Sequence, residues 1–114
     1  MTDALGLLDQ LRCTSARRPI WIWGAGNQGR GIGSVLQKQG IALAGFIDQA
    51  ADRMLSGILD LPVRSPSDLL DQVGDPASAS APFVIIASWF FESDIAKRLQ
   101  QAGLTESQDF IGYA

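Results

Sequence analysis

Three glycines near the start of the chain carry its clearest chemical signal. Gly24, Gly26 and Gly29 match the spacing G-x-G-x-x-G. The first glycine of this spacing permits a tight turn, the second lets a phosphate approach the backbone, and the third lets a helix pack closely on a strand. The helix that follows directs free N–H groups and the positive end of its dipole at the turn. The spacing therefore predicts a turn that binds a phosphate-bearing ligand.

Asp48 is the next residue whose type and position indicate chemistry. It follows a second apolar run, 43–47, about 20 residues after the glycines, where an acid accepts hydrogen bonds from a ribose. The alternative is a tight strand–helix turn with an ordinary loop aspartate. We favour the nucleotide site because strand, turn, helix and acid occur in the order that the motif requires. Arg53 could approach a 2′-phosphate, but Asp48 would repel that group, so NAD is favoured over NADP.

A third stretch, Ala87-Ser88-Trp89, ends another apolar run. It should meet the glycine turn at the carboxyl ends of neighbouring strands, where ligands bind in such sheets. Trp89 is equally suited to stacking on a base or nicotinamide-like ring and to covering the core. We expect Phe90 and Phe91 to cover the core, with Phe91 packing on Ile95. The predicted cofactor-binding residues are Gly24, Ala25, Gly26, Asn27, Gln28, Gly29, Asp48, Ala87, Ser88 and Trp89.

Catalytic groups are scarce in this sequence. A hydride-transferring enzyme needs an acid or base beside its substrate, yet the chain has no histidine, and its one tyrosine, Tyr113, is next to last. Lys38 and Lys97 fall in predicted helix bodies, and Arg30 is as well placed to be solvated as to reach a phosphate. No P-loop is present, and Trp23 stands where a methyltransferase core normally has an acid. The catalytic residues are therefore unknown, and we expect no metal site because the chain lacks clustered zinc ligands.

The elements that must position these residues alternate between strands and helices. Apolar runs without alternation, such as Ile20–Trp23 and Phe83–Ala87, suit parallel strands buried on both faces. We predict an α/β domain, a three-layer Rossmann-like half with a mostly parallel sheet of about five strands in the order 3-2-1-4-5. Residues 1–18 hold an N-terminal helix, expected over about Asp3–Arg12 and covering a sheet edge, and residues 19–114 form the nucleotide-binding domain. Further expected elements are a loop or short helix over 49–56, an edge strand at Leu61–Val63, a helix starting at Ser65-Pro66 and a terminal strand over 109–113.

Composition and charge narrow the class of protein. With 114 residues, of which 46% are hydrophobic and 18% charged, the chain fits one globular domain. Its net charge of −3 argues against a nucleic-acid surface, and its one adjacent basic pair, Arg17 and Arg18, should lie at the sheet end opposite the glycine turn. Cys13 is the only cysteine, and no apolar run reaches the roughly 18 residues of a membrane span. We expect a cytoplasmic protein that binds neither nucleic acid nor membranes.

Four stretches of the chain together resemble a known kind of module. They are Ile22–Gly29, Gly45–Asp48, Leu61–Val63 followed by Ser65-Pro66, and Val84–Ser88. With them, residues 20–111 look like the small Rossmann-like module attached to bacterial polysaccharide and nucleotide-sugar enzymes, such as FkbM-type methyltransferases, sugar C-methyltransferases and sugar O-acetyltransferases. The resemblance implies that Gly24–Gly29 and Asp48 hold a nucleotide, a nucleotide-sugar or a dinucleotide. We expect no catalytic domain after Ala114, so the chemistry of those enzymes would lie in a partner.

Three functions are compatible with the sequence. The first is a nucleotide-binding module that holds NAD or, alternatively, a nucleotide-sugar and serves a sugar-modifying or polysaccharide-biosynthesis enzyme. The second is a small NAD-dependent oxidoreductase that is active as an oligomer. The third is a structural or interaction domain whose site has lapsed. In each case the leucine stripe Leu5, Leu8 and Leu11 favours a homo-oligomer or docking on a partner catalytic domain.

Overall fold

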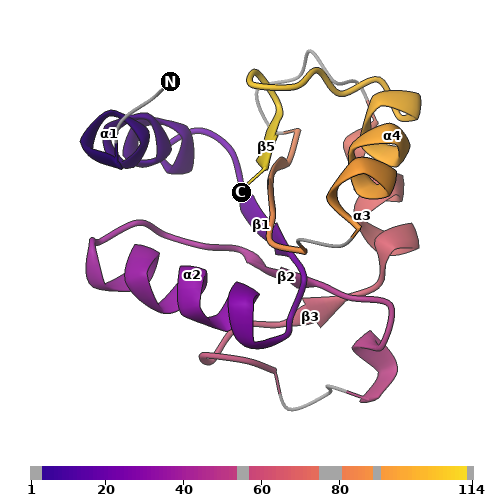
Figure 1. Ribbon diagram of the computed structural model, residues 1–114, viewed down its shortest axis with the longest axis horizontal. Helices are drawn as coiled ribbons and strands as arrows, with labels where there is room; N and C mark the ends of the chain where they lie inside the picture. Colours follow the sequence, from indigo (N-terminus) through magenta and orange to yellow (C-terminus); the bar gives the residue numbers. More distant parts are fainter. Residues whose placement is uncertain (1–3, 54–56, 75–80, 89–90, 113–114) are drawn as a thin grey trace.

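The computed structural model describes residues 4–53, 57–74, 81–88 and 91–112, and Figure 1 shows their arrangement. Strands and helices alternate after an N-terminal helix. In chain order the elements are α1 (Ala4–Ser15), β1 (Ile20–Trp23), α2 (Asn27–Lys38), β2 (Gly45–Ile47), the short 3-10 helix η1 (Ala51–Arg53), β3 (Val63–Arg64), α3 (Pro66–Val73), β4 (Phe83–Ile86), α4 (Glu92–Gln101) and β5 (Phe110–Gly112).

The strands form one parallel sheet in the order β3-β2-β1-β4-β5. The chain moves from β1 outward through β2 to β3, and then returns past β1 to β4 and β5. Ile22 of β1 aligns with Phe46 of β2 on one side and with Ile85 of β4 on the other. The predicted fold class and strand order are therefore confirmed. In sheets of this kind, ligands bind where the order reverses, which here is between β1 and β4.

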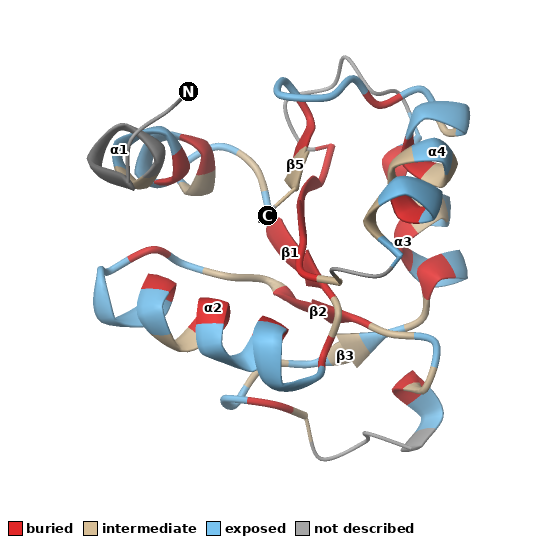
Figure 2. Cartoon of the chain, in the orientation of Figure 1, coloured by how far each residue is buried: buried red, intermediate tan, exposed pale blue. Residues whose placement is uncertain are grey.

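Both faces of the sheet are covered, which explains the continuous apolar runs of the central strands. All residues of β1 and of β4 are buried. Ile20 and Ile22 pack with α1 and α2, whereas Trp21 and Trp23 point to the other face and pack with α3 and α4. Figure 1 shows these two pairs of helices on opposite sides of the strands, and Figure 2 shows the buried residues gathered between the layers. The three-layer arrangement is as predicted.

The N-terminal helix differs from its prediction in length and in place. α1 extends past Arg12, and Asp3 lies outside the described residues. Leu11 is 1% exposed and belongs to the cluster that includes Ile32 of α2 and Ile85 of β4, so α1 covers a face of the sheet and not its edge. The reason is topological. The helices that lead into and out of β4 pack on the other face, so β4 has no crossover helix on the α2 side.

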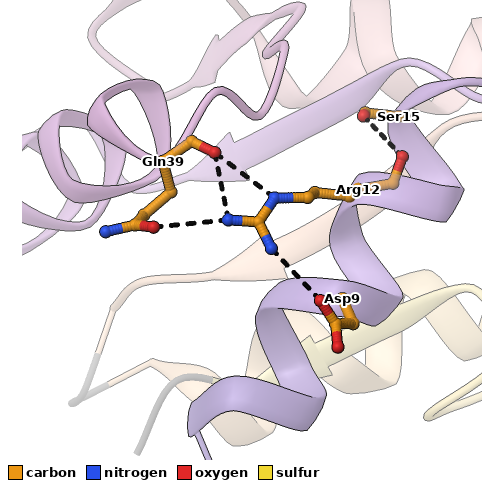
Figure 3. A network of polar contacts seen from close by, with 4 residues as sticks. All are labelled: Asp9, Arg12, Ser15 and Gln39. Atoms are coloured by element: carbon orange, nitrogen blue, oxygen red, sulfur yellow. Dashed lines mark hydrogen bonds and ion pairs between the residues drawn. The ribbon is translucent and has the colours of Figure 1, made fainter.

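Polar contacts link α1 to the end of α2 (Figure 3). The Arg12 guanidinium donates to the backbone carbonyl and the side-chain oxygen of Gln39 at 3.3–3.4 Å, and it pairs with Asp9 at 3.1 Å. These groups are exposed, so water competes for every contact and the ion pair contributes little to the free energy of unfolding. Apolar packing therefore contributes more to holding α1 on the domain, through the buried Leu11 and through Leu8, which packs against the same cluster.

A second arginine closes the end of the sheet where β1 and β4 begin. The Arg18 guanidinium donates to the carbonyls of Ala81 at 2.7 Å and Pro82 at 2.8 Å, and it pairs with Asp109 at 3.1 Å. It also lies over the Phe83 ring, 5.7 Å from the centroid. These contacts join the segment before β1 to the starts of β4 and β5. The predicted place of Arg18, at the end opposite the glycine turn, is confirmed.

The remaining predicted elements are present with shifted bounds. Ser65 caps α3 by accepting a hydrogen bond from Asp68 N at 3.2 Å, and Pro66 opens the helix, as predicted. The edge strand starts at Val63, and η1 occupies part of the segment expected as a loop or short helix. β5 ends at Gly112, and the last two residues lie outside the described chain. No helix among the described residues is long and apolar enough to cross a membrane.

Candidate functional site

The chain turns sharply where β1 ends, and Gly24 makes this turn possible. Its φ of +124° is a conformation that L side chains rarely adopt. The Gly24 N–H donates to the Ile47 carbonyl at 2.7 Å, which ties the turn to β2. A Cβ on Gly24 would come within 3.3 Å of the Ala87 backbone, so the turn also packs tightly against the end of β4.

Gly29 lets α2 rest directly on this turn. A Cβ on Gly29 would lie 1.7 Å from the Gly24 carbonyl oxygen, which is too close for any side chain. One helical turn later, a Cβ on Gly33 would meet Phe46 at 3.0 Å and Ile22 at 3.4 Å, so α2 stays close to the sheet. The packing role that the spacing predicts for the third glycine is confirmed.

Gly26 stands at the open side of the turn. No described atom beyond its chain neighbours lies within 4 Å of a Cβ built there, so a ligand has room to approach the backbone. Gly26 is the N-cap of α2 and supplies no side-chain hydrogen bond. The first backbone bond of the helix runs from Arg30 N to Gly26 O. Asn27, Gln28 and Gly29 therefore present N–H groups that no intrahelical carbonyl satisfies, at the positive end of the helix dipole.

Asp48 lies at the same rim as the glycine turn and is bonded to it. One carboxylate oxygen accepts a hydrogen bond from Ala25 N at 3.1 Å, and the other accepts from Ala50 N at 2.9 Å. The Asp48 side chain is half-buried, and each oxygen keeps a further lone pair that can accept from a hydroxyl. Ala25 itself is fully buried, so its N–H orients Asp48 and does not face a ligand.

An open cleft of about 680 Å³ lies at the carboxyl ends of β1 and β4, between the start of α2 and α4. This volume is in the range of sites for small molecules, about 300–1,000 Å³. Most of the predicted cofactor-binding residues border it, namely Gly24, Gly26, Asn27, Gln28, Gly29, Asp48, Ala87 and Ser88. Trp89 lies outside the described residues, as does Phe90. The cleft also has lining residues that were not among the predicted cofactor-binding residues, namely Trp23, Gln49, Phe91, Asp94, Ile95 and Arg98.

Phe91 does not cover the core as expected. Its side chain is 61% exposed and borders the cleft. Phe91 is the N-cap residue of α4, with φ −112° and ψ 10°, so it precedes the first helical turn and does not share the inner face of the helix. Ile95, which is 6% exposed, fills that inner position instead.

The α4 wall of the cleft carries two charged side chains. Asp94 and Arg98 are one helical turn apart, and both border the cleft. The Arg98 guanidinium lies over the Trp23 ring, 5.4 Å from the centroid. Ile95 and Leu99 mark the buried face of the helix, and residues 94 and 98 flank it. This pattern does not show which of the flanking residues reaches the cleft.

Of the two arginines considered from the sequence, Arg30 does not border the cleft. The Arg30 side chain is exposed, and its Nε donates to the Ala25 carbonyl at 3.1 Å, so it braces the turn from the helix side. The side chain of Arg53 lies outside what the structure describes. Among the described side chains, Asp48 is a predicted charge that borders the cleft, and Arg98, which was not predicted there, supplies a positive charge.

The arrangement is suited to an anionic ligand that also carries hydroxyl groups. The helix N–H groups and the Arg98 guanidinium favour negative charge, and Asp48 accepts hydrogen bonds from hydroxyls. Among the described lining residues, the carboxylates are those of Asp48 and Asp94. Across the described part of the chain, no group of three or more His, Cys, Asp or Glu side chains is placed to hold a metal ion.

Comparison with known proteins adds no family to this geometry. A scan against protein-family models finds no match, and a search of curated proteins finds none either. The chemistry of the cleft therefore has to be argued from its own residues.

Proposed function

We propose that this chain is a nucleotide-binding module that holds NAD or a nucleotide-sugar at the turn between β1 and α2. The observation that carries the proposal is the uncapped start of α2 at Gly26, open to a cleft that Asp48 also borders. Backbone N–H groups at a helix N-terminus bind phosphate because they point along the helix dipole toward the anion.

In the proposed complex the ligand's phosphate contacts the N–H groups of Asn27, Gln28 and Gly29. Its ribose hydroxyls donate to Asp48, whose two bonds to backbone N–H groups hold the carboxylate at the rim of the turn. The bonded carboxylate disfavours a second phosphate at the ribose, which supports NAD over NADP.

We infer that the module serves a sugar-modifying or polysaccharide-biosynthesis enzyme. The resemblance of Ile22–Gly29 and Gly45–Asp48 to modules attached to such enzymes supports this role. An open cleft also fits it, because a ligand bound at the ends of β1 and β4 stays accessible to a second protein or domain.

Native mass spectrometry of freshly purified protein tests this proposal, because it shows a retained nucleotide and the number of subunits in one measurement. We expect added mass that matches NAD or a nucleotide-sugar. Protein stripped of nucleotide should then bind NADH in a fluorescence titration or UDP-glucose in calorimetry. Absence of a retained nucleotide, together with no binding of either compound at millimolar concentration, rejects the proposed function.

A further inference from the structure

Arg98 is placed to contact a ligand on the wall of the cleft that faces the start of α2. It lies on α4, far in sequence from the glycine turn, yet both border the same cleft. Its side chain is half-buried, and its guanidinium lies over the Trp23 ring at 5.4 Å from the centroid. Trp23 is 4% exposed, so the ring is a fixed support that holds the cation at the end of β1.

Two other arginines already have carboxylate partners within the protein. Arg12 and Arg18 form ion pairs with Asp9 and Asp109. No carboxylate in the described ranges lies within 4.0 Å of the Arg98 guanidinium. An arginine held over an aromatic face keeps its N–H donors at the ring edge, where they are directed at a planar or tetrahedral anion.

Two carboxylates share the cleft with Arg98, and they limit which anion fits. Asp48 lies on the β2 side and accepts two backbone N–H groups, so its charge is partly offset. Asp94 is exposed and lies one turn nearer the start of α4 than Arg98. A ligand satisfies these groups if its phosphate lies between α2 and Arg98 and its hydroxyl groups point toward Asp48 and Asp94. A longer run of phosphates would reach the Asp94 carboxylate and be repelled by its negative charge.

We infer that Arg98 binds the diphosphate of the ligand from the wall opposite the glycine turn. This inference rests on the proposed function and names the ligand class more closely. The ligand is a nucleoside diphosphate in which the group attached beyond the diphosphate carries hydroxyl groups and not a further phosphate. Arg98 is then a ligand-binding residue, and Trp23 positions it through the contact between the guanidinium and the ring.

Calorimetry with ADP, UDP, inorganic pyrophosphate and the free nucleosides tests the inference on stripped protein. The variants are Arg98→Met, Arg98→Lys and the matched control Lys97→Met, an exposed position of the same helix that does not border the cleft. Losing one charge-assisted contact should weaken diphosphate binding by roughly 10- to 100-fold in Arg98→Met. We expect Arg98→Lys to fall between wild type and Arg98→Met, and Lys97→Met and nucleoside binding to stay unchanged.

The outcomes separate this inference from the proposed function. If the wild-type protein binds ADP or UDP and Arg98→Met binds it equally well, the role of Arg98 is overturned while the proposed function stands. If pyrophosphate alone binds in an Arg98-dependent way and no nucleotide does, the proposed function fails and the phosphate role of Arg98 stands. If nothing binds to the wild type, both are rejected. Circular dichroism melts of each variant verify that a loss of binding does not come from unfolding.

Discussion

Asp48 and Ala25 are joined by a hydrogen bond of 3.1 Å, from the backbone N–H of Ala25 to one carboxylate oxygen of Asp48. The acid after β2 and the turn after β1 are therefore one unit, although they lie far apart along the chain. This bond fixes the carboxylate at the rim of the cleft before any ligand arrives. The proposed ribose contact consequently needs little rearrangement of the protein.

The two hydrogen bonds that Asp48 accepts predict that replacing its carboxylate lowers the free energy of unfolding. In Asp48→Asn only one side-chain atom can accept a hydrogen bond, so the N–H of Ala25 or of Ala50 faces an amide donor. We expect the free energy of unfolding to fall by about 1–3 kcal/mol in urea denaturation. Asp71→Asn, at an exposed position of α3, serves as the control and should change it by less than about 0.5 kcal/mol. Equal stability of the two variants would contradict the bonded arrangement.

The close packing of α2 on the turn predicts opposite effects for two alanine substitutions in one helix. Gly29→Ala places a Cβ 1.7 Å from the Gly24 carbonyl oxygen, so the helix must shift, at a cost of about 3 kcal/mol or more. Gly31→Ala meets no atom within 4 Å and should stabilise the helix by up to about 1 kcal/mol. Thermal and urea unfolding of both variants checks the pair. A harmless Gly29→Ala would mean that α2 does not lie on the turn as described.

Arg18 and Arg12 each form an ion pair, but the Arg18 pair is largely buried and the Arg12 pair is exposed. Removing the two arginines should therefore lower the free energy of unfolding by different amounts. Arg18→Met leaves Asp109, whose side chain is 6% exposed, without its cation and frees three carbonyls. We expect a loss of roughly 3 kcal/mol in the free energy of unfolding. Arg12→Met removes an ion pair whose side chains are 45% and 78% exposed, and should cost less than about 1 kcal/mol. Comparable losses in the two variants, measured by urea denaturation, would argue against the buried pair.

The sequence was sufficient to predict the sheet because each step depends on local patterns. The unbroken apolar runs Ile20–Trp23 and Phe83–Ala87 indicate strands buried on both faces, and alternation with helices then restricts the strand order. The glycine turn and Asp48 were predictable for the same reason, since G-x-G-x-x-G and the acid after the next strand have a known spatial relation.

The residues that the sequence did not reveal depend on how distant elements pack. Arg98 reaches the cleft because α4 lies against Trp23, and no local pattern encodes that approach. Phe91 was expected to cover the core and pack on Ile95 because aromatic side chains more often serve packing. Phe91 instead precedes the first turn of α4, and the sequence pattern does not show on which side of the helix start its side chain lies. The position of α1 likewise depends on packing between distant elements. It covers the face of the sheet at β4 that the crossover helices α3 and α4 leave uncovered.

The central claim is that the uncapped start of α2 binds the phosphate of a nucleotide, and one substitution tests it most directly. Gly26→Asp puts a favoured N-cap side chain where a Cβ has open space and φ is −79°, so the free energy of unfolding should change by only a few tenths of a kcal/mol. Its carboxylate would occupy the free N–H groups and repel an anion. Gly31→Asp, in the same helix but outside the cleft, is the matched control.

The measurement is the affinity of the wild type and of these two folded variants for NADH and UDP-glucose. We predict that whichever nucleotide the wild type binds is also bound by Gly31→Asp and is lost from Gly26→Asp. Unchanged affinity in Gly26→Asp would contradict the account, because a ligand that tolerates a carboxylate at that position does not bind through the start of α2.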